Sequence, residues 1–147
     1  MTIPPFQEGG NLPPGIHGAT WEEIIERFGG TAWRSELLSG LRNALENLRH
    51  AGCRRAYIDG SFATAKEAPG DFDACWEAAG VDPDRLDPVL LTFVNARAAQ
   101  KERFRGELFP AEAAADPHGT RFLDYFQQDK LTGEPKGIVA IDLEELP

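Results

Sequence analysis

The stretch from Gly60 to Asp73 reads GSFATAKEAPGDFD, and it decides the fold and the site that we expect. A short apolar run at residues 56–58 precedes it, and a run with alternating apolar residues at 71–76 overlaps its end. The glycines and the proline that lie between the two runs interrupt strands and favour turns. The sequence therefore predicts two strands that are close in the chain and are joined by a turn and a loop.

Asp71 and Asp73 lie two residues apart on the second of these strands. Residues i and i+2 of a strand point to the same face, so both carboxylates share a face, with Cys75 next along it. The opposite face is apolar and carries Phe72, Ala74 and Trp76. Two carboxylates about 5 Å apart repel by roughly 3 kcal/mol at an effective dielectric near 20. A divalent cation turns this repulsion into coordination, and hard oxygen ligands favour Mg²⁺ or Mn²⁺.

The Gly60-Ser61 turn at the other end of the stretch offers groups that can hold phosphate. Glycine lets the backbone come close to a ligand, and the Ser61 hydroxyl with the backbone N–H groups that follow can bind phosphate oxygens. Thr64 and Lys66 lie a few residues further along, and Lys66 is a candidate phosphate contact because its ammonium acts as a point charge. These four residues form the expected nucleotide-binding part of the site.

A Gly-Ser turn, nine intervening residues and Asp-x-Asp on a strand resemble the signature of the DNA polymerase β-type nucleotidyltransferase superfamily. The match is to the small stand-alone bacterial members in particular. A wider pattern also resembles a family of short bacterial and phage proteins that is assigned to the same superfamily. That pattern runs through Leu12-Pro13-Pro14-Gly15, Gly60-Ser61-Phe62 and Lys136-Gly137-Ile138.

The resemblance implies a site for two metal ions, with two carboxylates on one strand and a third on a neighbouring strand. The metals clamp the triphosphate of a nucleotide and activate an acceptor hydroxyl for in-line attack on the α-phosphorus. Carried over to this chain, Asp71 and Asp73 are the expected metal ligands and catalytic residues. Gly60 and Ser61 are expected to cradle the β- and γ-phosphates.

Two residues are candidates for the third carboxylate. Glu107 begins a strand expected at residues 107–109 and is the first choice, as a metal ligand and a catalytic residue. Asp142, in the last expected strand at residues 138–143, is the alternative metal ligand. Members of the superfamily usually carry Asp at this position, so Glu107 is a departure whose longer side chain places the oxygens differently.

The remainder of the chain supplies helices and further strands. Helices are expected at residues 20–28, 31–50, 87–104 and 121–128. Thr20 and Glu23 have the spacing of a capping box, and Thr31 can cap the second helix. The resulting order, α-α-β-β-α-β-α-β, predicts an α/β (α+β) fold of the nucleotidyltransferase type, in which helices cover a small mixed sheet.

Domain organisation follows from length and composition. A chain of 147 residues has the size of one domain. Residues 1–18 contain four prolines and four glycines and are interpreted as an extended leader, followed by a single nucleotidyltransferase-like domain at residues 19–147. Leu12 and Ile16 are apolar, which leaves open that the leader packs across the domain.

Charge, hydropathy and cysteine content narrow the class of protein. The net charge of −9 disfavours broad nucleic-acid binding, although a bound cation would still allow a nucleotide to bind. No apolar run approaches the roughly 18 residues of a membrane span, and the first residues do not resemble a signal peptide. Cys53 and Cys75 are too few for a disulfide scaffold, which predicts reduced thiols and a cytoplasmic location.

The sequence thus favours an enzyme that transfers a nucleoside monophosphate from a nucleoside triphosphate to an unidentified acceptor, which could be RNA, protein or a small molecule. The resemblance makes a toxin–antitoxin or phage-defence context one hypothesis. An inactive nucleotide- or partner-binding module that retains the fold is the alternative. A subunit completed by a protein partner or by a second copy is a third hypothesis.

A basic cluster near the end of the third helix either complements the helix dipole or contacts the acceptor. It consists of Arg97, Lys101, Arg103 and Arg105.

Overall fold

A five-stranded mixed sheet forms the centre of the protein, and its strand order is β1-β5-β2-β3-β4. The computed structural model describes residues 3–66 and 69–147, except for the side chain of Ser61. The strands are β1 (Gly15–Gly18), β2 (Arg55–Asp59), β3 (Phe72–Trp76), β4 (Gly106–Pro110) and β5 (Gly137–Asp142). β2 runs antiparallel to both β3 and β5, whereas β1 is parallel to β5 and β4 is parallel to β3. The expected mixed α/β class with a small mixed sheet is confirmed.

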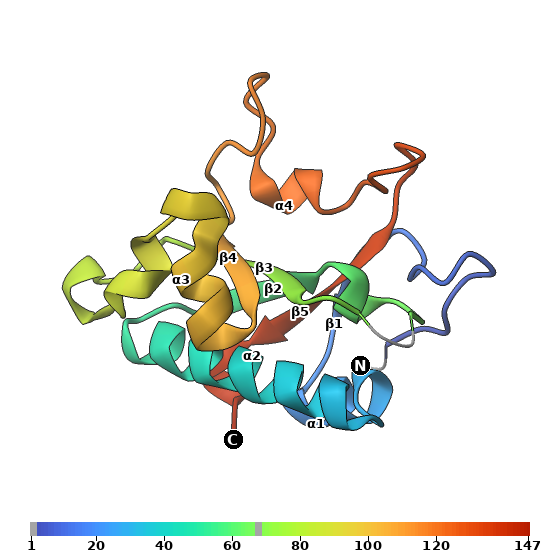
Figure 1. Ribbon diagram of the computed structural model, residues 1–147, viewed down its shortest axis with the longest axis horizontal. Coiled ribbons are helices and arrows are strands. Elements are labelled where there is room, and N and C mark those ends of the chain that lie inside the picture. Colours follow the sequence, from blue (N-terminus) through green and yellow to red (C-terminus); the bar gives the residue numbers. More distant parts are fainter. Residues whose placement is uncertain (1–2, 67–68) are drawn as a thin grey trace.

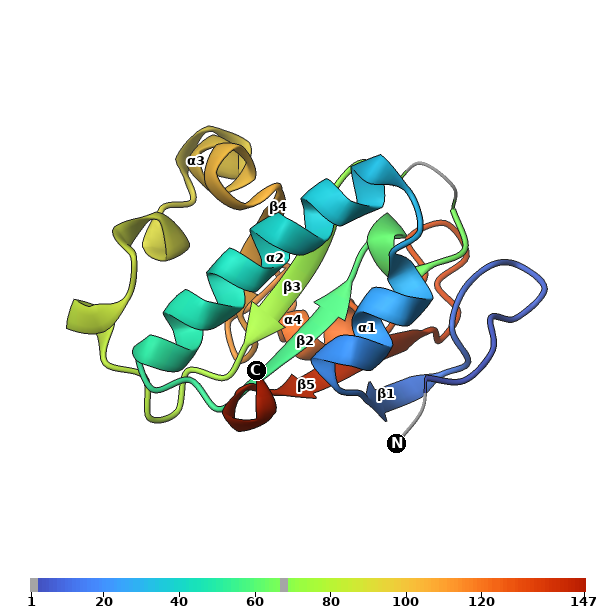
Figure 2. The ribbon, with the colours of Figure 1, turned by 90° about the horizontal axis from the view of Figure 1, so that it is seen from below.

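Helices α1 (Trp21–Phe28) and α2 (Ala32–His50) lie together on one face of this sheet (Figure 2). Both begin where the sequence predicts a cap. The Thr20 Oγ1 atom accepts a hydrogen bond of 3.2 Å from the Glu23 N–H, and the Thr20 N–H donates one of 3.0 Å to Glu23 Oε1. The Thr31 side chain accepts a hydrogen bond of 3.0 Å from the Arg34 N–H. These contacts satisfy N–H groups that a helix start otherwise leaves unpaired.

The alternation expected for β3 divides its side chains between two apolar clusters. Phe72, Ala74 and Trp76 are buried in the larger cluster, which they share with α1 and α2. Cys75 is buried in a smaller cluster on the opposite face, which α4 (Phe122–Tyr125) and the segment around it cover (Figure 1). The face that carries the acidic side chains is therefore the one beneath α4.

The leader expected at residues 1–18 differs from the structure, because residues 15–18 form the edge strand β1. Gly15 to Gly18 pair in parallel register with residues 137–140 of β5, and the Leu12 side chain is fully buried. The expected order of elements therefore lacked its first strand. Strand pairing here depends on backbone hydrogen bonds to a segment about 120 residues away, and the sequence GIHG has no strand pattern of its own.

The single helix expected from residue 87 to residue 104 is also incorrect. A 3₁₀ turn occupies Pro88–Leu91, and α3 then spans Val94–Phe104, with left-handed φ angles of 54° to 60° at residues 95–97. The buried Gln100 side chain donates to the Leu90 carbonyl oxygen at 3.4 Å and accepts from the Leu108 N–H at 2.8 Å. Residues ten positions apart in a continuous helix are about 15 Å apart, so this tertiary contact requires the chain to bend.

Among the described residues, no helix combines the length and the apolar character needed to cross a membrane.

Candidate active site

Three acidic residues occupy one row across neighbouring strands. Asp59 of β2 is the register partner of Asp73 in β3, and Asp73 is the register partner of Glu107 in β4. Residues directly opposite each other on adjacent strands lie on the same face, with Cβ atoms about 5 Å apart. Asp71 precedes Asp73 by two residues and lies directly before the first residue of β3. The structure therefore places Glu107 on the strand next to Asp73, and it places Asp59 on the strand at the other side. The predicted roles of Asp71, Asp73 and Glu107 as metal ligands stay predictions.

Gly60 lies in direct contact with the central carboxylate of this row. Its φ of 81° falls in the region that favours glycine. A Cβ atom at Gly60 would lie 3.0 Å from Asp73 Oδ2 and 2.9 Å from the Asp73 backbone nitrogen. The turn therefore contacts Asp73 directly.

A hollow of about 320 Å³ opens beside the turn and the acidic pair. The segment at residues 127–136 forms one wall, because it folds back on itself as a hairpin. Its Asp129 N–H donates to the Glu134 carbonyl oxygen at 2.8 Å, and its Lys136 N–H donates to the Gln127 carbonyl oxygen at 2.9 Å. The hollow is lined by Gly60, Thr64, Asp71, Asp73, Asp129, Lys130 and Lys136.

Cationic side chains surround the acidic row from two elements of the fold. From the hairpin, Lys136 Nζ lies 2.8 Å from Asp59 Oδ1, and Lys130 Nζ lies 3.9 Å from Asp73 Oδ2. From α3, Lys101 Nζ lies 3.0 Å from Glu107 Oε1, and Arg97 Nη2 lies 3.3 Å from Glu107 Oε2. Asp71 has no ion pair within 4.0 Å among the described residues.

Burial and mutual repulsion raise the pKa values of the central acids. Burial of the Asp73 carboxylate raises its pKa to about 7, and the charges of Asp59, Glu107 and Asp71 add to the rise, whereas Lys130 opposes it. The pKa of Asp71 is raised mainly by burial and then by Glu107, against the opposing charges of Lys101 and Lys130. A buried carboxylate that has other carboxylates as neighbours resists ionisation.

A divalent cation fits the donor chemistry of Asp71 and Asp73, whose four carboxylate oxygens are hard ligands of the kind that Mg²⁺ and Mn²⁺ prefer. Within the described part of the chain, no group of three or more His, Cys, Asp or Glu side chains is arranged to hold a metal ion. Glu107 can join the acidic pair only by leaving its ion pairs with Arg97 and Lys101.

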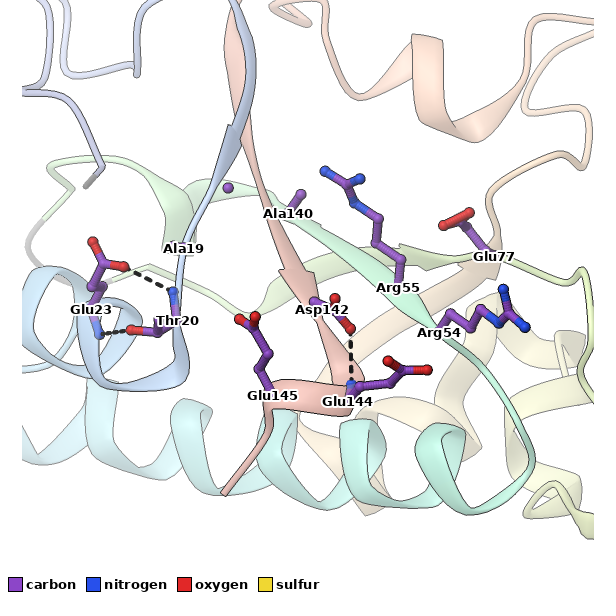
Figure 3. A pocket seen from close by; sticks show the side chains of 11 residues that line it. Ala19, Thr20, Glu23, Arg54, Arg55, Glu77, Ala140, Asp142, Glu144 and Glu145 are labelled. Atoms are coloured by element: carbon purple, nitrogen blue, oxygen red, sulfur yellow. Dashed lines mark hydrogen bonds between the residues drawn. The ribbon is translucent and has the colours of Figure 1, made fainter. Parts of the chain in front are cut away.

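Asp142, the alternative third carboxylate, lies away from the acidic pair. It is the register partner of Arg55 at the start of β2, whereas Asp59 ends that strand. Four residues of strand span about 13 Å. The Asp142 carboxylate accepts a hydrogen bond of 3.0 Å from the Glu144 N–H and lines a different hollow of about 530 Å³ (Figure 3). Of the two candidates, only Glu107 is next to Asp73.

The expected phosphate contacts beyond Gly60 fall into three groups. Thr64 lines the hollow beside Asp73. Lys66 is exposed and lines another hollow, of about 340 Å³, on the side of α2. The side chain of Ser61 lies outside the described residues, so its expected role in phosphate binding stays a prediction.

Sequence reasoning missed Asp59, Lys130 and Lys136. Asp59 carried a usable signal, because it is a charged residue that ends an apolar strand directly before Gly60. The two lysines carried no signal of this kind, since they lie 71 and 77 residues after Asp59, in a segment without a motif. Only the folding of the hairpin over the sheet brings them to the hollow.

A comparison with protein families matches residues 4–142 to the family described as "Family of unknown function (DUF6932)". The match includes β1, both residues of the acidic pair and the hairpin. A comparison with curated proteins and a comparison with solved structures found no match.

Proposed function

We propose that this chain, which belongs to the family of unknown function DUF6932, transfers a nucleoside monophosphate from a nucleoside triphosphate to an acceptor hydroxyl in the presence of Mg²⁺ or Mn²⁺. One observation carries this proposal. The Asp73 carboxylate is packed against Gly60, so a turn that can approach phosphate and a pair of hard oxygen ligands lie side by side.

Asp71 and Asp73 are the residues that would hold the cation. Both are partly buried and acquire raised pKa values by burial and repulsion, and the cationic atom nearest to Asp73 among the described residues is 3.9 Å away. A bound divalent ion would neutralise this charge, polarise the phosphates and lower the barrier for attack at phosphorus.

The triphosphate is proposed to lie in the hollow beside Gly60 and Thr64. Lys130 and Lys136 line the same hollow and supply positive charge. Lys130 is the more available of the two, because its side chain is 64% exposed, whereas Lys136 is 11% exposed and paired with Asp59.

The reaction is a substitution at the α-phosphorus. The acceptor oxygen forms a new bond to that phosphorus, the bond from the phosphorus to the bridging α–β oxygen breaks, and pyrophosphate leaves. Glu107 is our candidate to accept the proton of the acceptor hydroxyl, once the carboxylate is free of Lys101 and Arg97. Positioning and charge supply most of the catalysis in reactions of this class.

The finer fold assignment is part of the same proposal. We propose that the sheet with α1 and α2 on one face is a small version of the nucleotidyltransferase fold. The arrangement of β2, the Gly60 turn and β3, with an acidic neighbour on β4, supports this assignment. The acceptor is proposed to be RNA, a protein or a small molecule, in keeping with the superfamily that the motif resembles.

Transfer of label from each of the four nucleoside triphosphates tests the proposal. Purified protein is incubated with α-labelled nucleotide, Mg²⁺ or Mn²⁺ and separate pools of RNA, protein and small hydroxylated acceptors. We expect label in one pool, and we expect the Asp71→Ala/Asp73→Ala variant to reduce it at least a hundredfold. Asp142→Ala serves as a matched control on the same sheet and is expected to retain transfer. Labelling by the double variant at the wild-type rate would contradict the proposal.

A second candidate function is a binding module without turnover. The ion pairs of Glu107 with Arg97 and Lys101 favour it, because they occupy the carboxylate that a second metal requires. This candidate predicts that nucleotide binds with the same affinity in EDTA and in Mg²⁺, as measured by calorimetry, and that no label is transferred.

A further inference from the structure

Arg34 is a buried cation in the first turns of α2. Arg34 is only 6% exposed. Among the described residues, its guanidinium makes no ion pair with a carboxylate. Buried charges are rarely found in proteins unless other groups compensate them. Burial also lowers the pKa of Arg34 from its ordinary value.

Backbone carbonyl oxygens compensate this charge. Nη1 donates to the Phe28 carbonyl oxygen at 3.0 Å and to the Phe62 carbonyl oxygen at 2.8 Å. Nη2 donates to the Thr64 carbonyl oxygen at 3.0 Å and also to the carbonyl oxygen of Lys66. Three of the four acceptors therefore belong to residues 62–66, the segment that follows the Gly60 turn.

The three acceptors alternate along the segment, at positions 62, 64 and 66. The planar fork of arginine presents several N–H groups in a fixed geometry, which suits a row of alternate carbonyls. The Arg34 guanidinium also lies 5.5 Å from the centroid of the Phe62 ring, and this contact fixes the same segment a second time.

The other side of the segment is fixed as well. The Ala63 N–H donates to the Gly60 carbonyl oxygen at 3.1 Å, and the Ala65 N–H donates to the Gly10 carbonyl oxygen at 3.0 Å. Thr64 lines the hollow that also contains Asp71 and Asp73. The path of residues 62–66, and with it the direction of the turn, is therefore set by Arg34 on one side and by backbone contacts on the other.

We propose that Arg34 is a positioning residue of the nucleotide site: its fork holds residues 62–66 so that Gly60 and Thr64 face Asp73, and its buried charge favours a polyanion at that turn. This inference rests on the proposed function, because it assigns the polyanion to the triphosphate of the substrate. Carbonyl dipoles stabilise the guanidinium without cancelling its net charge, so the positive field behind the turn remains.

The matched variants Arg34→Met and Arg34→Lys separate the two contributions. Methionine removes both the fork and the charge, whereas lysine keeps the charge and loses the fork. Arg49→Met is the control, since Arg49 lies on the same helix and also donates to a backbone carbonyl, that of Leu146, but it does not contact the turn. Binding of inorganic tripolyphosphate with Mg²⁺ is measured by calorimetry, and exchange of the Ala63 and Ala65 amides by hydrogen–deuterium exchange.

We expect Arg34→Met to weaken tripolyphosphate binding at least tenfold and Arg34→Lys to weaken it about threefold. Both variants should exchange the Ala63 and Ala65 amides faster than the wild type does. In the transfer assay, the KM for nucleotide should rise with the same ranking, while the KM for the acceptor stays unchanged. Arg49→Met should leave all of these readouts at their wild-type values.

Unchanged tripolyphosphate affinity in folded Arg34→Met or Arg34→Lys protein, while the wild type binds and transfers, overturns the role of Arg34 and leaves the proposed function intact. An equal loss of affinity in Arg49→Met also overturns it, because the effect would then follow from general destabilisation. Wild-type protein that binds no tripolyphosphate and transfers no label overturns the proposed function and, with it, this inference. If Arg34→Met does not fold, the comparison of Arg34→Lys with Arg49→Met decides the question.

Discussion

Asp73 is a carboxylate whose environment opposes its own charge. Its pKa of about 7 lies above the value near 3.9 of an unfolded chain, so the folded protein binds this proton more tightly than the unfolded protein does. The contribution to stability is therefore fully present below about pH 4 and is lost as the pH rises through 7. A divalent cation bound at Asp73, as we propose, would offset this unfavourable charge.

Replacing the charge should therefore stabilise the protein. We expect Asp73→Asn to be more stable than the wild type at pH 8 by on the order of 2–4 kcal/mol in EDTA, with the difference shrinking towards pH 4. Urea unfolding at pH 4, 6 and 8 measures this. Addition of Mg²⁺ at pH 8 should stabilise the wild type alone. An Asn variant that is no more stable than the wild type at pH 8 would show that the carboxylate is not destabilised as described.

Gly60 should tolerate no side chain, for two separable reasons. Its φ of 81° strains any other residue, and an added Cβ would meet Asp73 Oδ2 at 3.0 Å. We expect Gly60→Ala to lose about 2–3 kcal/mol of unfolding free energy together with metal-dependent nucleotide binding. Gly119→Ala is the control, because Gly119 has a φ of 82° but nothing within 4 Å of an added Cβ. Gly119→Ala should lose about 1 kcal/mol of unfolding free energy and keep nucleotide binding. Equal losses of unfolding free energy in the two variants would contradict the contact between Gly60 and Asp73.

At the scale of elements, the hairpin at residues 127–136 brings two lysines with different roles to the site. Lys136 forms a buried ion pair with Asp59, whereas Lys130 is mostly exposed and 3.9 Å from Asp73. Removing one partner of a buried pair leaves an uncompensated charge, whereas exposed pairs contribute little to stability.

Replacement of Lys136 by alanine should therefore affect mainly stability, whereas replacement of Lys130 should affect mainly triphosphate binding. We expect Lys136→Ala to lose about 3–5 kcal/mol of unfolding free energy. We expect Lys130→Ala to change stability by less than about 0.5 kcal/mol. Lys130→Ala should instead weaken triphosphate binding severalfold, while Lys130→Arg restores it. Thermal unfolding and calorimetry on the two variants distinguish the roles, and a fully active Lys130→Ala variant would exclude this lysine from the phosphate site.

At the scale of the whole molecule, the N-terminal segment contacts two parts of the chain that form walls of the site. The Asn11 side chain donates a hydrogen bond of 2.8 Å to Asp129 in the hairpin, and the Gly10 carbonyl oxygen accepts from the Ala65 N–H behind the turn. Leu12 is buried in the main apolar cluster. The segment thus connects the Gly60 side of the hollow with its lysine side.

Truncation of the Leu12 side chain tests this connection. We expect Leu12→Ala to cost about 2–5 kcal/mol of unfolding free energy, as for other buried leucines. Ile16→Ala is the matched control, because Ile16 is 40% exposed, and it should lose less than about 1 kcal/mol. Urea unfolding measures both. A Leu12→Ala variant as stable as Ile16→Ala would indicate a leader that does not pack on the domain.

The sequence by itself determined the elements whose signals are local. The caps at Thr20 and Thr31, the division of β3 into an apolar and an acidic face, and the acid pair at Asp71 and Asp73 all follow from spacing, because hydrogen bonds and strand alternation act over two to four residues. The position of Glu107 on a strand was predicted by the same means, and the structure places it in β4, one residue after the start of that strand.

Only the tertiary structure decided which distant segments meet. The pairing of β1 with β5 and the contact of Gln100 with Leu90 each join residues that carry no local pattern for the contact. The same holds for the ion pairs of Lys130 and Lys136 with the acidic row and for the hydrogen bond of Arg34 to Phe62. Such contacts form because the whole chain must bury its apolar faces and pair its backbone groups at once. The choice of Glu107 over Asp142 beside Asp73 depended in the same way on strand order, which no spacing along the chain reveals.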